Sequence, residues 1–236
     1  MTVLMGVVGS TVYGLATEDC EPAVLGVYLA DAEEVCGLRG PTALTRTYVS
    51  PDGSLTMHEL CRFATLALEA DPAASELLWL DSYTVRTEEG RALIDVREAF
   101  LAAPRVREAY ANAALRSFRR VSSSPHEDRD EFSGDDELAE RTMRHARSCV
   151  RLLRQGRALL TTGRLVIDMS AQREDVFAAG RLATFNPKAF SAFVDKELAA
   201  LGSIASVLPD SPDTERVNAV LVELRMASLR QATEKT

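Results

Sequence analysis

Two short apolar runs rich in β-branched residues stand near the start of the chain, at residues 3–9 (VLMGVVG) and 24–30 (VLGVYLA). Runs of this length and composition are typical of buried strands. Residues 44–50 alternate and predict a third strand, which ends before the turn signal Pro51-Asp52-Gly53. The first part of the chain is therefore predicted to form a sheet in which residues 3–9 and 24–30 are neighbouring strands.

The rest of the chain follows a helical period. Apolar residues recur at helical spacing from Thr56 to Glu69, and Thr56 with Glu59 matches a capping box, which predicts that a helix begins at Thr56. Further helices are predicted at 73–80, 92–103, 105–120, 137–160, 188–201 and 212–231. This order predicts an α/β (α+β) fold, with an α/β core at 1–85 and a mostly helical region at 86–236 packed on it.

Residues 121–136 (VSSSPHEDRDEFSGDD) break the helical pattern. They are polar and acidic and have no apolar period, as in segments that cannot bury enough surface to fold. We expect an exposed, mobile loop that folding does not require.

Composition narrows the class of protein. The formal net charge of −8 argues against a surface that binds polyanions throughout, although it allows a local basic pocket. The four cysteines have no metal-ligand spacing and are expected to be free, mostly buried thiols. No apolar run is long enough to span a bilayer, and the apolar start lacks a basic leader. We expect a cytoplasmic protein with no membrane partner.

The first predicted strand ends in a glycine-containing motif, GSTVYGLATEDCE, at residues 9–21. Glycine lets a backbone approach a phosphate closely, and successive amides form a concavity that binds anions. The motif, followed by Leu25-Gly26-Val27-Tyr28, resembles the Gly-Ser loop of the DNA polymerase β superfamily. The resemblance implies a nucleotidyltransferase-type mixed sheet and a nucleotide-binding role for Gly9, Ser10, Tyr13 and Gly14.

Later segments resemble one branch of that superfamily, the predicted nucleotidyltransferases of the RNA-repair-pathway polymerase β family. The matching segments occur in the order HELCRF at 58–63, SELLW at 75–79, RHA at 144–146 and RLLRQG at 151–156. The resemblance covers residues 3–225. It implies Mg²⁺ or Mn²⁺ with a nucleoside triphosphate as cofactors, and a nucleotide with an RNA or protein acceptor as partners.

The acids that hold the two metal ions in this superfamily are largely missing. The resemblance places the Asp-x-Asp pair at Glu21 and Ala23 and the third acid at about Ser54. Only Glu21 remains as a weak metal ligand, because alanine has no ligand atom and serine is a poor ligand for magnesium. Other acids stand nearby, at Glu18, Asp19 and Asp52. We interpret them as solvated loop charges, and substitute metal ligands are the alternative.

A basic stripe lies on the predicted 137–160 helix, where Arg144, Arg147, Arg151 and Arg154 recur at helical spacing. Arginine forks suit phosphate groups. We therefore include Arg144, His145, Arg147 and Arg151 in the candidate nucleotide site. An ordinary solvated helix face is the alternative interpretation.

Three functions remain open. The first is a degenerate enzyme or pseudoenzyme that retains a nucleotide or RNA phosphate pocket. Ala23, at a position where the superfamily has a metal-binding acid, favours this function. The second is an active nucleotidyltransferase with a relocated metal site. The third is a non-catalytic protein-interaction module, in which Gly9 and Gly14 persist only because the turn needs them. The sequence does not define the catalytic residues or the oligomeric state.

Overall fold

The computed structural model describes residues 1–17, 22–38, 40, 44–50, 53–122 and 135–234. The chain divides into two compact units, Met1–Ala102 with Pro209–Thr236, and Ala103–Leu208. The last segment of the chain belongs to the first unit.

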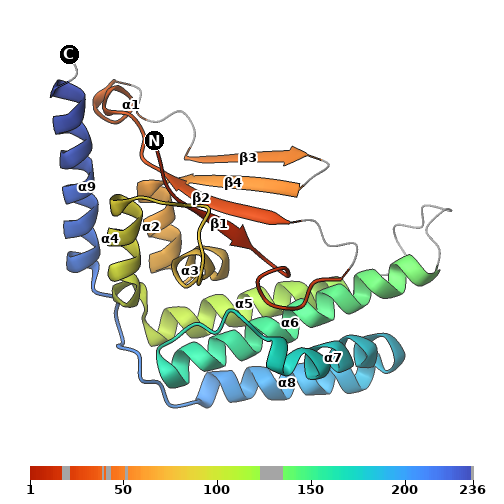
Figure 1. Ribbon diagram of the computed structural model, residues 1–236. Coiled ribbons are helices and arrows are strands. Elements are labelled where there is room, and N and C mark those ends of the chain that lie inside the picture. The colour runs from red at the N-terminus through yellow and green to blue at the C-terminus, as the bar shows by residue number, and fades with distance from the viewer. Residues whose placement is uncertain (18–21, 39, 41–43, 51–52, 123–134, 235–236) are drawn as a thin grey trace. The chain divides into compact units, whose positions relative to one another are not determined.

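The first unit contains a mixed sheet of five strands in the order β3-β4-β2-β1-β5 (Figure 1). The strands are β1 (Thr2–Val8), β2 (Ala23–Tyr28), β3 (Thr45–Ser50), β4 (Gly53–Glu59) and β5 (Val85–Arg86). β1 and β2 pair antiparallel, which confirms the neighbouring strands expected from the two apolar runs. β4 lies parallel to β2 and antiparallel to β3. A mixed sheet followed by a mostly helical half confirms the predicted fold class.

The predicted helix start at Thr56 is wrong. Thr56 lies inside β4, where it pairs with Leu25 of β2, and the helix α2 (Leu60–Leu68) begins only after Glu59. Glu59 is the N-cap, and its carboxylate accepts a hydrogen bond of 2.7 Å from the backbone N–H of Cys61. Within residues 53–59, polar and apolar side chains alternate from Ser54 to His58. Pairing with β2 provides hydrogen-bond partners for the backbone N–H and C=O groups. This pairing outweighed the local capping-box pattern.

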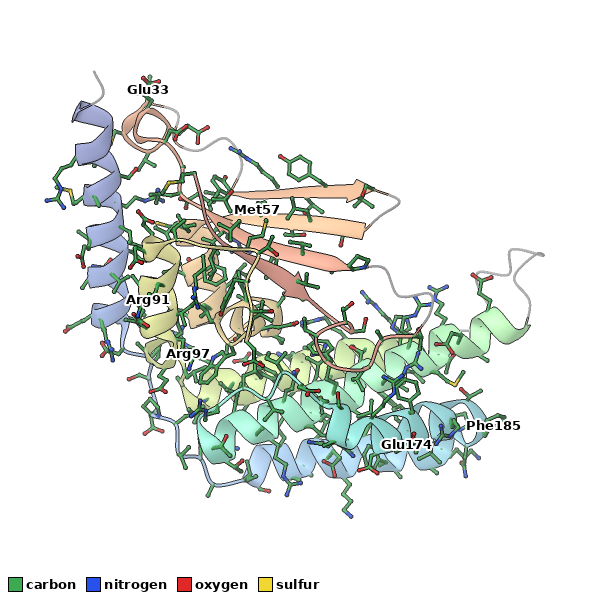
Figure 2. The ribbon with its side chains drawn as sticks, in the orientation of Figure 1. Glu33, Met57, Arg91, Arg97, Glu174 and Phe185 are labelled. Atoms are coloured by element: carbon green, nitrogen blue, oxygen red, sulfur yellow. The ribbon has the colours of Figure 1, made fainter. Side chains whose placement is uncertain are left out.

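Helices pack against the sheet and bury its core. The helical segments of this unit are α1 (Ala32–Cys36), α2, α3 (Pro72–Leu78), α4 (Glu88–Asp95), η1 (Arg97–Phe100) and α9 (Thr214–Glu234). α2 and α3 contact β2, and α3 and α4 contact β1. Leu4 and Val27 of the sheet and Phe63 and Leu77 of the helices are fully buried. A smaller cluster joins Tyr28, Ala30 and Met57, and Figure 2 shows Met57 beside the strands.

One ion pair links the end of the chain to the sheet. Arg225 of α9 donates a hydrogen bond to the carboxylate of Glu59, whose side chain is only 1% exposed. Elsewhere α9 contacts α1, α2, α4 and η1. A buried carboxylate needs a compensating charge, so this pair makes the fold of the first unit depend on a helix more than 150 residues away along the chain.

In the second unit, the described residues form helices joined by short connecting segments and no strand. Its helices are α5 (Ala103–Ser122), α6 (Asp135–Thr162), η2 (Ser170–Gln172), α7 (Arg173–Phe185) and α8 (Pro187–Ser203). α6 contacts α5, α7 and α8. Arg107 of α5 donates hydrogen bonds to the carbonyls of Leu201 (2.6 Å) and Ile204 (2.5 Å). A cation there satisfies carbonyls that the end of α8 leaves without partners.

Some expectations fall outside the described residues. The acidic segment expected to form a loop at 121–136 is not described between residues 123 and 134.

Among the cysteines, Cys149 is buried, whereas Cys36 and Cys61 are exposed free thiols, so the expectation of mostly buried thiols was wrong for those two. Burial raises the pKa of the Cys149 thiol to about 12. Within the described residues, no helix has the length and apolar character needed to cross a membrane.

The Glu59–Arg225 pair leads to a stability prediction. Arg225→Ala leaves the buried Glu59 carboxylate without its cation, and we expect it to lower the free energy of unfolding by about 3 kcal/mol. Urea unfolding followed by the fluorescence of Trp79, the only tryptophan in the chain, measures this in the first unit. Arg230→Ala removes an exposed arginine from the same helix and should change the value by less than about 0.5 kcal/mol. Equal unfolding midpoints for the two variants would show that the pair does not hold α9.

Candidate functional site

The Gly-Ser motif forms a tight turn directly after β1. Gly9 and Gly14 have φ angles of +85° and +68°, which residues other than glycine rarely adopt. The carbonyl of Gly9 accepts hydrogen bonds from the amides of Val12 (3.1 Å) and Tyr13 (3.3 Å). Thr11 is exposed and forms no hydrogen bond with any residue that the structure describes.

A buried carboxylate anchors this turn. Glu76 of α3 is 4% exposed, and its Oε1 accepts a hydrogen bond of 2.7 Å from the amide of Gly9. Its Oε2 accepts a hydrogen bond from the hydroxyl of Tyr13, which is also buried. The Glu76 carboxylate therefore connects two points of the turn, Gly9 and Tyr13, to α3. Two hydrogen bonds to one buried side chain restrain the turn at two points.

The parallel pairing of β2 with β4 identifies the residues beside the turn. Ala23, the first residue of β2, pairs with Ser54 of β4. A Cβ atom built on Gly9 would lie 3.9 Å from the Cβ of Ala23, so the turn begins next to this pair. The resemblance placed two of the three metal-binding acids at Ala23 and Ser54. The structure brings these positions together on adjacent strands, but neither residue has a carboxylate.

The described residues do not fit the two metal ions of a polymerase β-type site. Ala23 offers no ligand atom, and the hydroxyl of Ser54 is a weak substitute for a carboxylate. No group of three or more His, Cys, Asp or Glu side chains suited to a metal ion occurs in the described part of the chain. The weak metal candidate Glu21 lies outside the described residues, as do Glu18, Asp19 and Asp52.

The basic stripe belongs to the second unit, on α6, and its members differ in their surroundings. Arg147 is only 8% exposed, pairs with Glu140, and places its guanidinium 4.6 Å from the ring centre of Phe177. Arg151 donates a hydrogen bond of 2.6 Å to Gln155. Arg144 is exposed. The helical spacing predicted a shared face, but that face is not uniformly open to a ligand.

His145 lies in a cationic neighbourhood on the same helix. Burial lowers the pKa of its imidazole, and the positive charges of Arg120, Arg141 and Arg144 lower it further. The ring is therefore neutral at pH 7 and can accept as well as donate a hydrogen bond. The surrounding guanidinium groups supply the positive charge of this region.

Glu76 is the site residue that the sequence interpretation missed. It stands in the segment SELLW, which contributed to the family resemblance, but no role was assigned to it. The sequence did contain a signal for this role. Glu76 stands beside residues that a short amphipathic helix would bury. Charged side chains are rarely buried without a partner, so a buried glutamate indicates a specific contact.

The comparisons with known proteins agree with the geometry. The model of the RNA repair pathway DNA polymerase beta family matches residues 1–223. A search of curated proteins finds no significant match. The matched region includes the Gly-Ser turn, the β2–β4 pair and the helices of the second unit. The chain belongs to the RNA repair pathway DNA polymerase beta family.

Proposed function

We propose that this nucleotidyltransferase-like protein holds the phosphates of a nucleotide at its Gly-Ser turn but is impaired as a two-metal transferase. The observation that carries the proposal is the pairing of Ala23 with Ser54 beside Gly9. It supports a pocket of the polymerase β type in which the acids are absent from the positions that would meet the metals.

Phosphate binding is supported by the shape of the turn. Positive φ angles at Gly9 and Gly14 fold the backbone tightly, and the exposed residue Thr11 lies between them. Backbone amides gathered in such a turn attract an anion. Glu76 is the positioning residue, because it fixes the turn through Gly9 and Tyr13 without itself facing a ligand in the proposal.

Impaired transfer follows from the chemistry of the missing acids. Two-metal catalysis requires carboxylates that bring two divalent cations within a few ångströms of each other. Without the ligands at Ala23 and Ser54, the mutual repulsion of the cations is not offset. An attacking hydroxyl is then neither activated nor placed, and misplacement alone costs about a hundredfold in rate.

A separate proposal concerns the second unit, in which we expect Arg144 and His145 to bind phosphate groups. Arg144 is the exposed member of the basic stripe, whereas Arg147 is engaged with Glu140 and Phe177. An exposed guanidinium suits a phosphate group, such as one of an RNA strand. A protein acceptor would not need this charge.

One sequence feature favours an active transferase with a relocated metal site as the second candidate. An acid stands two residues before each paired position, Glu21 before Ala23 and Asp52 before Ser54. The transfer assay below distinguishes this candidate from the first one.

The anchoring role of Glu76 leads to a prediction. Glu76→Ala leaves the amide of Gly9 and the hydroxyl of Tyr13 without their acceptor, which should lower the free energy of unfolding by about 2 kcal/mol and remove nucleotide binding at the turn. Glu76→Gln keeps an acceptor for Gly9 and should retain both properties. Glu69→Ala removes an exposed carboxylate and is the control. If Glu76→Ala bound nucleotide with unchanged affinity, the turn would not depend on this anchor.

The impaired chemistry leads to another prediction. Incubation of the wild-type chain with labelled nucleoside triphosphates, Mg²⁺ or Mn²⁺, and pooled RNA and protein acceptors should transfer little or no label. The double variant Ala23→Asp, Ser54→Asp restores both acids and should raise transfer by about a hundredfold or more. The matched control, Ala23→Asn with Ser54→Asn, has the same shape without the charges and should stay inactive. Robust wild-type transfer that disappears in Glu21→Ala or Asp52→Ala would establish the relocated metal site instead.

A further inference from the structure

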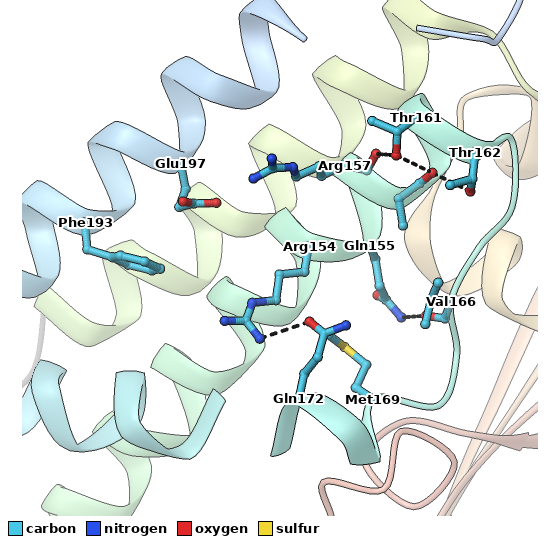
Figure 3. Close-up of a pocket in the computed structure, with 11 residues that line it drawn as sticks. Arg154, Gln155, Arg157, Thr161, Thr162, Val166, Met169, Gln172, Phe193 and Glu197 are labelled. Atoms are coloured by element: carbon cyan, nitrogen blue, oxygen red, sulfur yellow. Dashed lines mark hydrogen bonds between the residues drawn. The ribbon is translucent and has the colours of Figure 1, made fainter. Parts of the chain in front are cut away.

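The second unit contains a cavity that is separate from the Gly-Ser turn. It is a partly open cavity of about 410 Å³, within the range of small-molecule sites, and is lined by α6, η2 and α8 (Figure 3). Arg154 and Arg157 of α6 line one side, and Phe193 and Glu197 of α8 line the other. Figure 3 shows these four side chains around the same space.

The two arginines differ in how they are held. Arg154 donates a hydrogen bond of 3.0 Å to Gln172 and pairs with Asp175 at 3.4 Å, so its guanidinium is fixed in place. Arg157 is exposed, and its side chain pairs with no acid that the structure describes. One fixed and one free guanidinium on the same helix suit an anion that brings several oxygen atoms, such as a phosphate.

Phe193 gives the cavity an aromatic wall. Its ring stacks on the buried Phe190, with centroids 6.4 Å apart and an interplanar angle of 25°. Phe190 in turn packs against Phe118 at 5.9 Å. This aromatic row extends from the core of the unit to the cavity and holds Phe193 in place. A fixed ring beside a cationic wall suits a nucleobase, because every base has a face that stacks.

Glu197 adds an acceptor on the side of the aromatic ring. It forms no ion pair with Arg157 or with any other described residue, so its carboxylate is available to a ligand. A carboxylate that accepts from ribose hydroxyls is a common feature of nucleotide sites. Other polar groups are already committed: Gln155 accepts from Arg151 and donates to the carbonyl of Val166, and Thr161 donates to the carbonyl of Arg157.

We infer that this cavity binds a ribonucleotide unit, with its phosphate at Arg154 and Arg157, its base on Phe193 and its ribose at Glu197. The unit is either a free mononucleotide or the terminal residue of an RNA strand. The inference does not depend on the proposed function of the Gly-Ser turn, since the two sites use different residues in different units.

Calorimetric titration of the full chain tests the inference with three probes: nucleoside monophosphates, their deoxy counterparts and inorganic phosphate. The wild type should bind ribonucleoside monophosphates more tightly than either of the others. Arg157→Glu and Phe193→Ala should each weaken ribonucleotide binding at least about fivefold. Lys188→Glu makes the same charge change on an exposed residue of α8 outside the cavity and should have little effect. Glu197→Ala should reduce the preference for ribose over deoxyribose.

The same titration with short RNAs distinguishes the two sources of the ligand. Tighter binding of a 5′- or 3′-phosphorylated oligoribonucleotide than of the monophosphate, lost in Arg157→Glu, would show that the cavity takes an RNA end. Equal binding would show that it takes the free nucleotide. Arg157 is exposed, so its variant should fold, and a melting curve by circular dichroism checks this. Equal affinity for phosphate and nucleotides, or no loss of binding in Arg157→Glu and Phe193→Ala, would overturn the inference.

Discussion

The parallel register of β2 with β4 is the constraint on which the account of the site depends. It makes Ala23 and Ser54 neighbours, and the turn after β1 places Gly9 next to Ala23. If the register shifted by one residue, the side chains of one strand would lie on the other face of the sheet. The register is set by a core in which Leu25, Val27 and Leu60 are buried, so the side chains beside the turn are fixed by packing that is remote from any ligand.

Buried carboxylates connect that sheet to the rest of the first unit. Glu76 ties the Gly-Ser turn to α3, and Glu59 ties the end of β4 to Arg225 of α9. Each is almost fully buried and accepts a hydrogen bond from a backbone amide, which compensates part of the cost of burying a polar group. The turn and the last helix are therefore coupled to the sheet by directional polar contacts, and apolar packing supplies the bulk of the stability.

The sequence predicted many of the strands and helices, but it did not predict the side-chain contacts between them. Apolar runs identified β1 and β2, and helical periods identified α5, α6, α8 and α9, because these signals are local. The start of α2 was missed, because a capping-box pattern at Thr56 coincided with a strand that only its pairing with β2 stabilises. Helical spacing placed Arg147 on a basic face, but Glu140 and Phe177 cover it, and periodicity does not say what packs on a face. The contacts of Glu76 and Arg225 join segments far apart in sequence, so no local pattern could predict their partners.

The account centres on a pocket that retains its phosphate-binding turn without the acids for two metal ions. Calorimetric titration with each nucleoside triphosphate, in excess Mg²⁺ and again in excess chelator, tests this most directly. The account predicts binding of similar affinity in both conditions, because the amides of the turn hold the phosphates without a protein-bound metal. Binding that appears only with Mg²⁺ or Mn²⁺ would show that the chain supplies metal ligands and would contradict the account.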